Sequence, residues 1–141
     1  MAYSVLIVDD SMPMRSVIKK TFKAAGYGSM SFIEAEDGQK ALEQLSDNWV
    51  DMVLTDYNMP VMNGLELVKE MKKDDRFDQV PVVVITTEGS KEKMDEFYQF
   101  GASGYLQKPF APEQLRDIIV ELLGEIDYEE VAEDEGDDLD F

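Results

Sequence analysis

The sequence predicts an α/β fold in which a parallel sheet is covered by helices on both faces. Five short apolar runs rich in β-branched residues alternate along the chain with five segments whose apolar residues recur at helical spacing. The strand-like runs are continuously apolar, which is typical of strands buried on both sides. Helical crossovers between parallel strands account for both observations, because each crossover helix covers one face of the sheet.

The first half of the chain supplies two strands and two helices before the third strand. Residues 4–8, Ser-Val-Leu-Ile-Val, predict the first strand, and residues 30–35 predict the second. Ser11 is placed to cap the helix between them, with Pro13 in its first turn and Gly26 at its end. The apolar stripe of this helix is Met14, Val17, Ile18, Thr21, Phe22 and Ala25. A turn signal, Asp37-Gly38, then precedes a short helix marked by Ala41, Leu42 and Leu45.

The second half repeats the alternation three times. The third strand begins at Met52 and ends at Asp56, and the clearest strand of all covers residues 80–86, with Pro81 tolerated near its beginning. A short fifth strand covers residues 104–107. The helices that follow these strands have three apolar stripes: Leu65, Val68 and Met71 after Gly64; Met94, Phe97 and Tyr98 within residues 90–100; and Leu115, Ile118, Ile119, Leu122 and Leu123.

Composition excludes several classes of protein. The chain of 141 residues fits one domain with a single core. It contains no Cys and no His, which excludes disulfides, thiolate metal sites and imidazole chemistry and agrees with a cytoplasmic location. The net charge of −18 argues against nucleic-acid binding. There is no signal-peptide pattern and no apolar run near the ~18 residues of a membrane span, so we expect no membrane association.

The charge is concentrated at the end of the chain. Residues 124–141 hold ten of the 31 acidic residues and none of the 13 basic ones, whereas residues 1–123 carry a net charge of −8. We therefore predict a folded domain over 1–123 and an acidic, disordered tail over 124–141. The alternative is a docking segment punctuated by Tyr128, Val131, Leu139 and Phe141, which folds over the fourth-helix face and competes with partners.

Acidic residues stand where two of the expected strands end. Asp9 and Asp10 directly follow the first strand, and Asp56 closes the third. Ligands of parallel α/β sheets bind beyond the carboxyl ends of the strands, so three carboxylates converge there if these two strands are neighbours. Such a cluster destabilises itself unless a hard cation compensates its charge. Mg²⁺ suits two or three carboxylates plus water, and Ca²⁺ ranks second because it demands more protein oxygens.

A hydroxyl and an ammonium complete the set at the same edge. Thr86 closes the fourth strand and Lys108 follows the fifth. A carboxylate nucleophile beside Mg²⁺, a Lys and a Thr hydroxyl is what phosphoryl transfer to Asp56 requires, and no general base is needed because a carboxylate is normally ionised at neutral pH. Each residue alone has an ordinary structural role as a turn acid, a strand Thr or a surface Lys. Their joint placement at the ends of four strands favours the functional interpretation.

The sequence also resembles a known family, the receiver domains of two-component response regulators, and within it most closely the single-domain chemotaxis regulators. Four stretches carry this resemblance. They are Leu6-Ile7-Val8-Asp9-Asp10-Ser11, Glu34-Ala35-Glu36-Asp37-Gly38, Asp56-Tyr57-Asn58-Met59-Pro60 with Asn63-Gly64, and Gly101-Ala102-Ser103-Gly104-Tyr105-Leu106-Gln107-Lys108-Pro109-Phe110. The resemblance spans residues 4 to about 123 and implies a flavodoxin-like, doubly wound sheet of five parallel strands in the order 2-1-3-4-5, with five helices.

The resemblance implies a role for each site residue. Asp56 corresponds to the phosphoacceptor, and Thr86 and Lys108 to the groups that contact its phosphoryl group. The implied Mg²⁺ ligands are Asp10, Asp56 and the backbone carbonyl of Asn58, with Asp9 acting mainly through water. The bond between Lys108 and Pro109 is expected to be cis.

The resemblance further implies a signalling output that has a limited lifetime. Tyr105 corresponds to an aromatic switch in the face formed by the fourth helix, fifth strand and fifth helix. Side chains at Asn58, Thr87 and Glu88 flank the path of the hydrolytic water, and Thr87 departs from the chemotaxis pattern, which has a smaller residue there. The implied partners are a histidine kinase as donor, since this chain has no His, a downstream protein effector and a phosphatase. The expected state is a monomer that can dimerise when phosphorylated.

Two alternatives stay open at this point. The chain could be the receiver fragment of a hybrid kinase or multidomain regulator, with the acidic tail as a linker. It could instead be a phosphohydrolase with an Asp nucleophile, although such enzymes usually need a second acid close after the nucleophile, where this sequence has Asn58. We therefore expect a phosphoacceptor with self-catalysed phosphorylation and dephosphorylation, and no enzyme acting on a separate substrate.

Overall fold

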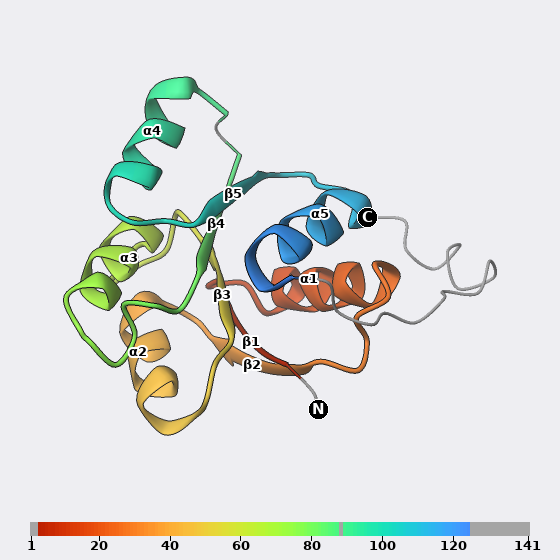
Figure 1. Ribbon diagram of the computed structural model, residues 1–141, viewed down its shortest axis with the longest axis horizontal. Helices are drawn as coiled ribbons and strands as arrows, with labels where there is room; N and C mark the ends of the chain where they lie inside the picture. Colours follow the sequence, from red (N-terminus) through yellow and green to blue (C-terminus); the bar gives the residue numbers. More distant parts are fainter. Residues whose placement is uncertain (1–2, 88, 125–141) are drawn as a thin grey trace.

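The computed structural model describes residues 3–87 and 89–124. Strands and helices alternate along this part of the chain (Figure 1). The strands are β1 (Ser4–Val8), β2 (Ser31–Ala35), β3 (Met52–Asp56), β4 (Val82–Thr86) and β5 (Gly104–Gln107). The helices are α1 (Met12–Ala24), α2 (Gly38–Asp47), α3 (Gly64–Lys72), α4 (Lys91–Gln99) and α5 (Pro112–Leu123).

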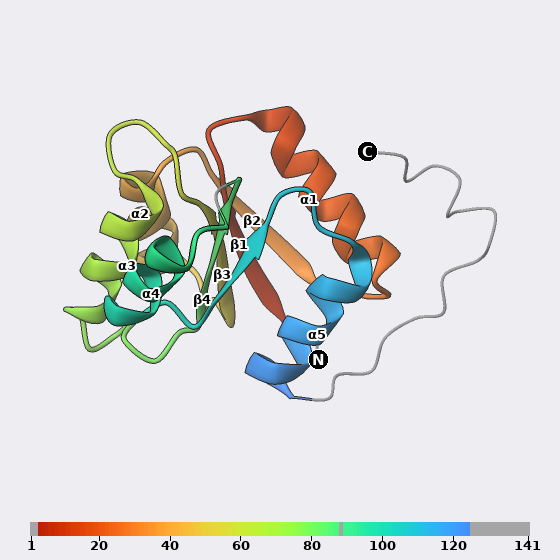
Figure 2. The ribbon, with the colours of Figure 1, turned by 90° about the horizontal axis from the view of Figure 1, so that it is seen from above.

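The five strands form one parallel sheet in the order β2-β1-β3-β4-β5, as the resemblance implied. Helices α1 and α5 cover one face, and α2, α3 and α4 cover the other (Figures 1 and 2). The predicted fold, with helices on both faces, is therefore confirmed.

The continuous apolar strands supply two separate cores. Along β1, Val5 and Ile7 pack under α1 and α5, whereas Leu6 and Val8 pack under α2, α3 and α4. Successive side chains of a strand point to opposite faces, so a strand buried on both sides must be apolar at every position. The pattern that predicted the sheet thus also stabilises both of its layers.

Two expected boundaries move by one or two residues. Strand β4 begins at Val82, not at residue 80, because the Val80 N–H donates to the carbonyl of Phe77 in a turn and Pro81 has no N–H to offer a neighbouring strand. Strand β2 begins at Ser31, because the Met30 N–H donates to the carbonyl of Tyr27.

The ends of the helices explain how the loops are held. Ser11 caps α1 by accepting a hydrogen bond from Met14 N at 3.3 Å, as expected. Asp37 caps α2 by accepting one from Lys40 N at 2.8 Å, so the predicted Asp37-Gly38 turn is the first turn of that helix. Both caps lie in loops that leave the carboxyl edge of the sheet.

Helix α5 ends at Leu123, and Gly124 follows it with φ +86°. The predicted acidic tail, apart from Gly124, lies outside the described residues, so the domain boundary stays a prediction. The peptide bond between Lys108 and Pro109 is cis, as expected. None of the described helices has the length and apolar character needed to cross a membrane.

Candidate functional site

The carboxyl ends of four adjacent strands bring the predicted residues together. Strand β1 pairs with β3, so the condition set by the sequence for Asp9, Asp10 and Asp56 to converge is met. The ladders continue just past the strands: Asp9 N donates to the carbonyl of Ala35 at 3.0 Å, and Lys108 N donates to that of Thr86 at 2.8 Å. Backbone hydrogen bonds therefore fix the main-chain positions of Asp9 and Lys108.

The three carboxylates form a compact cluster. One oxygen from each of Asp9, Asp10 and Asp56 lies within 4.8 Å of the others. Asp9 is 2% exposed and Asp56 is 9% exposed, whereas Asp10 is exposed to solvent. The cluster is thus open on one side and closed on the side of the sheet.

Lys108 is the cation of the site. Its Nζ lies 3.1 Å from Asp56 Oδ1 and 3.6 Å from Asp9 Oδ2. One ammonium faces three carboxylates, so the described cluster carries a net charge of −2 if all are ionised. This excess of negative charge, close to a partly buried edge, needs a further cation for balance.

Asp9 has the most unfavourable electrostatic environment of the three carboxylates. Its Oδ1 accepts a hydrogen bond from Ser11 N at 2.8 Å, but its buried Oδ2 has no hydrogen-bond partner among the described residues. Burial raises the pKa of Asp9, and the neighbouring Asp56 and Asp10 raise it further, against the opposing effects of Ser11 N and Lys108. A hard divalent cation with oxygen ligands would supply what Oδ2 lacks, so the residues present fit Mg²⁺.

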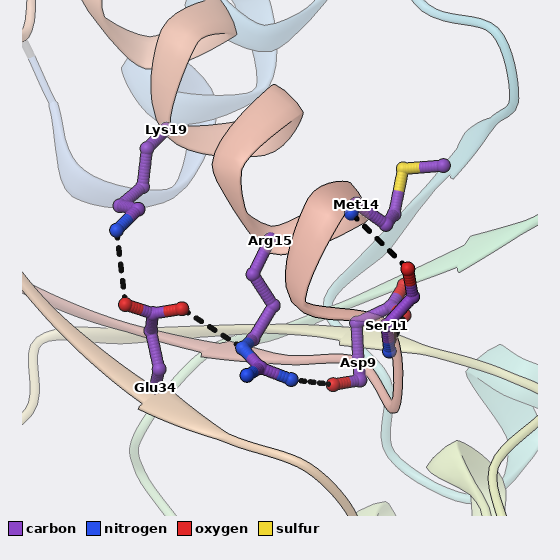
Figure 3. Close-up of polar contacts among 6 residues, drawn as sticks. All are labelled: Asp9, Ser11, Met14, Arg15, Lys19 and Glu34. Atoms are coloured by element: carbon purple, nitrogen blue, oxygen red, sulfur yellow. Dashed lines mark hydrogen bonds and ion pairs between the residues drawn. The ribbon is translucent and has the colours of Figure 1, made fainter.

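An ion-pair network that the sequence did not reveal supports the loop after β1 (Figure 3). Arg15 of α1 donates from Nη1 to the backbone carbonyl of Asp9 at 2.6 Å and from Nε to Glu34 Oε1 at 2.8 Å. Lys19 Nζ holds the other oxygen of Glu34 at 2.9 Å. The hydrogen bond from Lys19, together with that from Arg15, lowers the pKa of Glu34. The loop that carries Asp9 and Asp10 is therefore fastened to both α1 and β2.

The remaining predicted residues line the same edge at different depths. Thr86 is 2% exposed at the end of β4, while Thr87 and Asn58 are exposed beside it on their loops. Glu88 lies outside the described residues, so its predicted role is untested.

Tyr105 lies away from the carboxylates, on β5. It is half-buried and packs edge-to-face against Tyr98 of α4, with ring centroids 6.2 Å apart. Beside it is a hollow of about 370 Å³ between β5 and α5, which Asp117 and Glu121 also line. Tyr105 thus belongs to the surface formed by α4, β5 and α5, where the resemblance places the switch.

A second connection runs from the site to α4. Tyr57, which follows Asp56, packs against Phe97 with centroids 5.4 Å apart and accepts a hydrogen bond from Lys93 Nζ at 2.9 Å. Phe97 is the one buried residue of α4 among those described. The position of α4 therefore depends on the residue next to Asp56, and sequence patterns gave no sign of this pairing across 36 positions.

Comparison with known families decides the assignment. The family model described as response regulator receiver domain matches residues 5–120. The chain belongs to this family. It is a receiver domain of the kind found in two-component response regulators. The region matched contains the five strands, apart from Ser4 at the start of β1, and the whole cluster of site residues.

Individual relatives of this receiver domain are similar over nearly their full length. The chemotaxis protein CheY1 of Helicobacter pylori is 44% identical over 121 residues, which cover 85% of this chain and 96% of that protein. The structure of the chemotaxis protein CheY4 of Vibrio cholerae superposes with a TM-score of 0.77 at 37% identity, covering 86% of this chain and 99% of that one.

A more distant structure shares the fold. It is the receiver domain of the sensor histidine kinase PA1611 of Pseudomonas aeruginosa, in which a magnesium ion is coordinated in the active site cleft. Its TM-score is 0.77 at 23% identity, with 89% of this chain and 100% of that chain covered.

Proposed function

We propose that this receiver accepts a phosphoryl group on Asp56 and thereby switches a protein-binding surface. The observation that carries the proposal is the pairing of Lys108 Nζ with Asp56 Oδ1 at 3.1 Å, at an open edge where two more carboxylates converge. Asp56 is the only one of the three carboxylates that lies within a strand: it is the last residue of β3 and pairs with Ile85 of β4, so its position is firmly fixed.

The residues also support a Mg²⁺ site. We assign its protein ligands to Asp10, Asp56 and the backbone carbonyl of Asn58, with Asp9 beside them. When bound, Mg²⁺ neutralises charge on the transferring group and on the carboxylates. The receiver domain of the PA1611 kinase, which has the same fold, holds a magnesium ion in its active site cleft, and this supports the presence of a Mg²⁺ site without identifying its ligands.

The chain's own residues perform the rest of the chemistry. An oxygen of Asp56 attacks the phosphorus of the donor; its new P–O bond forms as the bond to the leaving group breaks, and the leaving nitrogen or oxygen takes up a proton from solvent. Lys108 and the hydroxyl of Thr86 offer donors to the phosphoryl oxygens. Hydrolysis reverses the modification when water attacks the phosphorus and Asp56 is released as a carboxylate.

Intact mass spectrometry tests the acceptor directly. The full chain is incubated with acetyl phosphate and Mg²⁺, and borohydride reduction then marks the acyl phosphate for peptide mapping. We expect one phosphoryl group on Asp56, none in Asp56→Asn and none when EDTA replaces Mg²⁺. Labelling that persists in Asp56→Asn would assign the acceptor to another residue.

We infer that the output surface is the one formed by α4, β5 and α5. Phosphorylation replaces the single negative charge of the Asp56 carboxylate, beside Thr86, by a phosphoryl group that carries roughly −1.5 to −2. Tyr57 couples this edge to α4 through Phe97 and Lys93. Tyr105 packs against α4 at the other end of the same surface. Tyr105→Ala should therefore keep the labelling of Asp56 and weaken effector binding. Trp49→Ala, which removes an exposed aromatic side chain between α2 and β3, outside the surface formed by α4, β5 and α5, should change neither.

The donor and the pathway follow from the same reasoning. Because the chain has no His, its donor must be another protein or a small phosphodonor. The family resemblance favours a histidine kinase as the donor, with a protein effector and a phosphatase as further partners. The similarity to chemotaxis proteins supports a chemotaxis role. We propose that the receiver works in the cytoplasm, as a monomer that can pair when phosphorylated.

A further inference from the structure

An apolar groove lies beside the site, where Lys108 is one of the residues that line it. It has a volume of about 350 Å³ and runs between α1 and the loop that joins β5 to α5. Its walls are apolar side chains, chiefly Met14, Val17 and Ile18 of α1 on one side and Pro109 and Phe110 on the other. Met14, Val17 and Phe110 are only half-buried, so the groove offers a surface that an apolar ligand would cover.

The charge beside the groove is positive in an otherwise acidic protein. Among the five described helices α1 alone has no acidic residue, and it has four basic ones. Arg15 and Lys19 are paired with Glu34, but Lys20 and Lys23 are exposed and form no ion pair with any described carboxylate. Lys20 is three residues from Val17, which places it on the helix surface next to the groove.

The acidic segment of the same chain begins at the far end of α5, within reach of the groove. Helices α1 and α5 lie side by side on one face of the sheet, and both run away from its carboxyl edge (Figure 2). A segment leaving Gly124 must return along the length of α5, whose 12 residues span about 18 Å, to reach the groove. Leu139 stands 15 residues after Gly124, and a flexible chain of that length has an r.m.s. span of about 20 Å. The segment between Gly124 and Leu139 is therefore long enough to reach the groove.

We propose that the segment 125–141 binds this groove in its own molecule. Leu139 and Phe141 supply the apolar side chains for the groove, and the nine acidic residues that precede Leu139 pass Lys23 and Lys20 on the way. The surface formed by α4, β5 and α5, which the sequence suggested as a docking place, is the poorer fit. Its hollow is lined by Asp117 and Glu121 and by no basic side chain among the described residues, so it repels an acidic segment.

The position of the groove gives the contact a consequence. Lys108 and Thr87 also line it, so a segment bound there stands at the approach to Asp56. This consequence rests on the proposed function. We expect removal of residues 125–141 to speed phosphorylation by a protein donor more than labelling by the small donor acetyl phosphate. The binding itself does not depend on this consequence.

Paramagnetic broadening in the full chain tests the binding independently of phosphorylation. The chain has no Cys, so Gly136→Cys accepts a single spin label without changing a charge. Methionine methyl signals then report the place of the segment: Met14 in the groove and Met94 on α4. We expect Met14 to broaden several-fold more than Met94, and the effect to fall with rising salt because ion pairing supplies part of the attraction.

Charge reversal distinguishes the groove from general attraction. Lys20→Glu with Lys23→Glu should abolish the selective broadening of Met14. Lys40→Glu with Lys73→Glu, which makes the same charge change at exposed positions of α2 and at the end of α3, should leave it intact. Mixing spin-labelled chain with isotope-labelled, unlabelled chain detects binding between molecules. Preferential broadening of Met94, equal broadening of both methyls, insensitivity to Lys20 and Lys23, or broadening that persists in the mixture would each overturn the proposal.

Discussion

Replacing Asp9 by Asn removes a buried negative charge while keeping the shape of the side chain. The hydrogen bond from Ser11 N to Oδ1, 2.8 Å long, is one that an amide oxygen also accepts. What disappears is the charge on Oδ2, which is buried without a hydrogen-bond partner among the described residues and faces the carboxylate of Asp56. We therefore expect the substitution to stabilise the metal-free protein.

The size of the effect follows from two opposing contributions. An unsatisfied buried acceptor costs about 1–3 kcal/mol, and charge makes the cost larger. Against this, Asn loses the attraction of Lys108, whose Nζ lies 3.6 Å from Oδ2, a contact too long for a good hydrogen bond. We expect a net gain of about 1–2 kcal/mol in the free energy of unfolding, which raises Tm by roughly 4–8 °C in a domain of this size.

Thermal unfolding in EDTA measures the stability without metal, and thermal unfolding in Mg²⁺ measures the response to the metal. Wild-type protein should gain stability with Mg²⁺, about 1.4 kcal/mol at ten times Kd, whereas Asp9→Asn should gain much less. Burial and the neighbouring carboxylates raise the pKa of Asp9 in the folded protein. The folded protein therefore loses stability as pH rises from the pKa of Asp9 in the unfolded chain to its higher pKa in the folded protein. The advantage of Asn should therefore be full at neutral pH and shrink on acidification. A variant that is less stable than wild type in EDTA, or that keeps the full response to Mg²⁺, would refute the reasoning.

Four further changes test other parts of the site. Arg15→Met should weaken Mg²⁺ binding several-fold and lower stability by about 1–2 kcal/mol, because the loop after β1 loses its hydrogen bonds; titration calorimetry and urea unfolding measure the two effects. Glu34→Gln should reduce the loss of stability in acid. The pKa of Glu34 is lowered in the folded protein, so its ionised form stabilises the fold above the unfolded-state pKa, and this stabilisation is lost as pH falls through the folded-state pKa. The contribution is only a few tenths of a kcal/mol, because the carboxylate is a third exposed. Gly64→Ala should cost about 2 kcal/mol or more in urea unfolding, since a Cβ there meets the backbone at the end of β3, whereas Gly28→Ala, with its nearest atom at 3.4 Å, should cost far less. Thr87→Ala should shorten the lifetime of the phosphorylated form by opening the approach of water, and an unchanged decay in a mass-spectrometric time course would remove Thr87 from the residues that set it.

The sequence predicted those parts of the structure that local patterns and parallel topology determine together. Five buried strands can be read from continuous apolar runs, and the residues that end them share an edge once the strands are parallel. This is why Asp9, Asp56, Thr86 and Lys108 were all placed at the correct edge before any distance was known. The strand order itself came from the family resemblance, because periodicity alone does not say which strands are neighbours.

What the sequence could not give are contacts between elements that lie far apart in the chain. Arg15 and Glu34 are 19 residues apart, and Tyr57 and Lys93 are 36 apart; each of these residues looks like ordinary surface or loop composition on its own. Burial of a polar atom is equally invisible, since Asp9 and Asp10 are adjacent and identical in the sequence yet differ sharply in exposure.

The cluster of charges links the stability of this receiver to its signalling role. Three carboxylates and one ammonium leave an excess of negative charge. In the proposed function a divalent cation offsets this charge, and a phosphoryl group on Asp56 then adds negative charge again beside Lys108. Each step changes the balance of attraction at Lys108, which at rest is shared between Asp56 at 3.1 Å and Asp9 at 3.6 Å. A site whose charges were balanced without a cation or a phosphoryl group would make a more stable fold, as Asp9→Asn is expected to show. In such a site, however, binding of the cation or of the phosphoryl group would not change the interactions of Lys108. On the proposed function, the switch requires this cost in stability. The unbalanced charge that weakens the folded state is also the charge that would act on α4, through the contact of Tyr57 with Phe97.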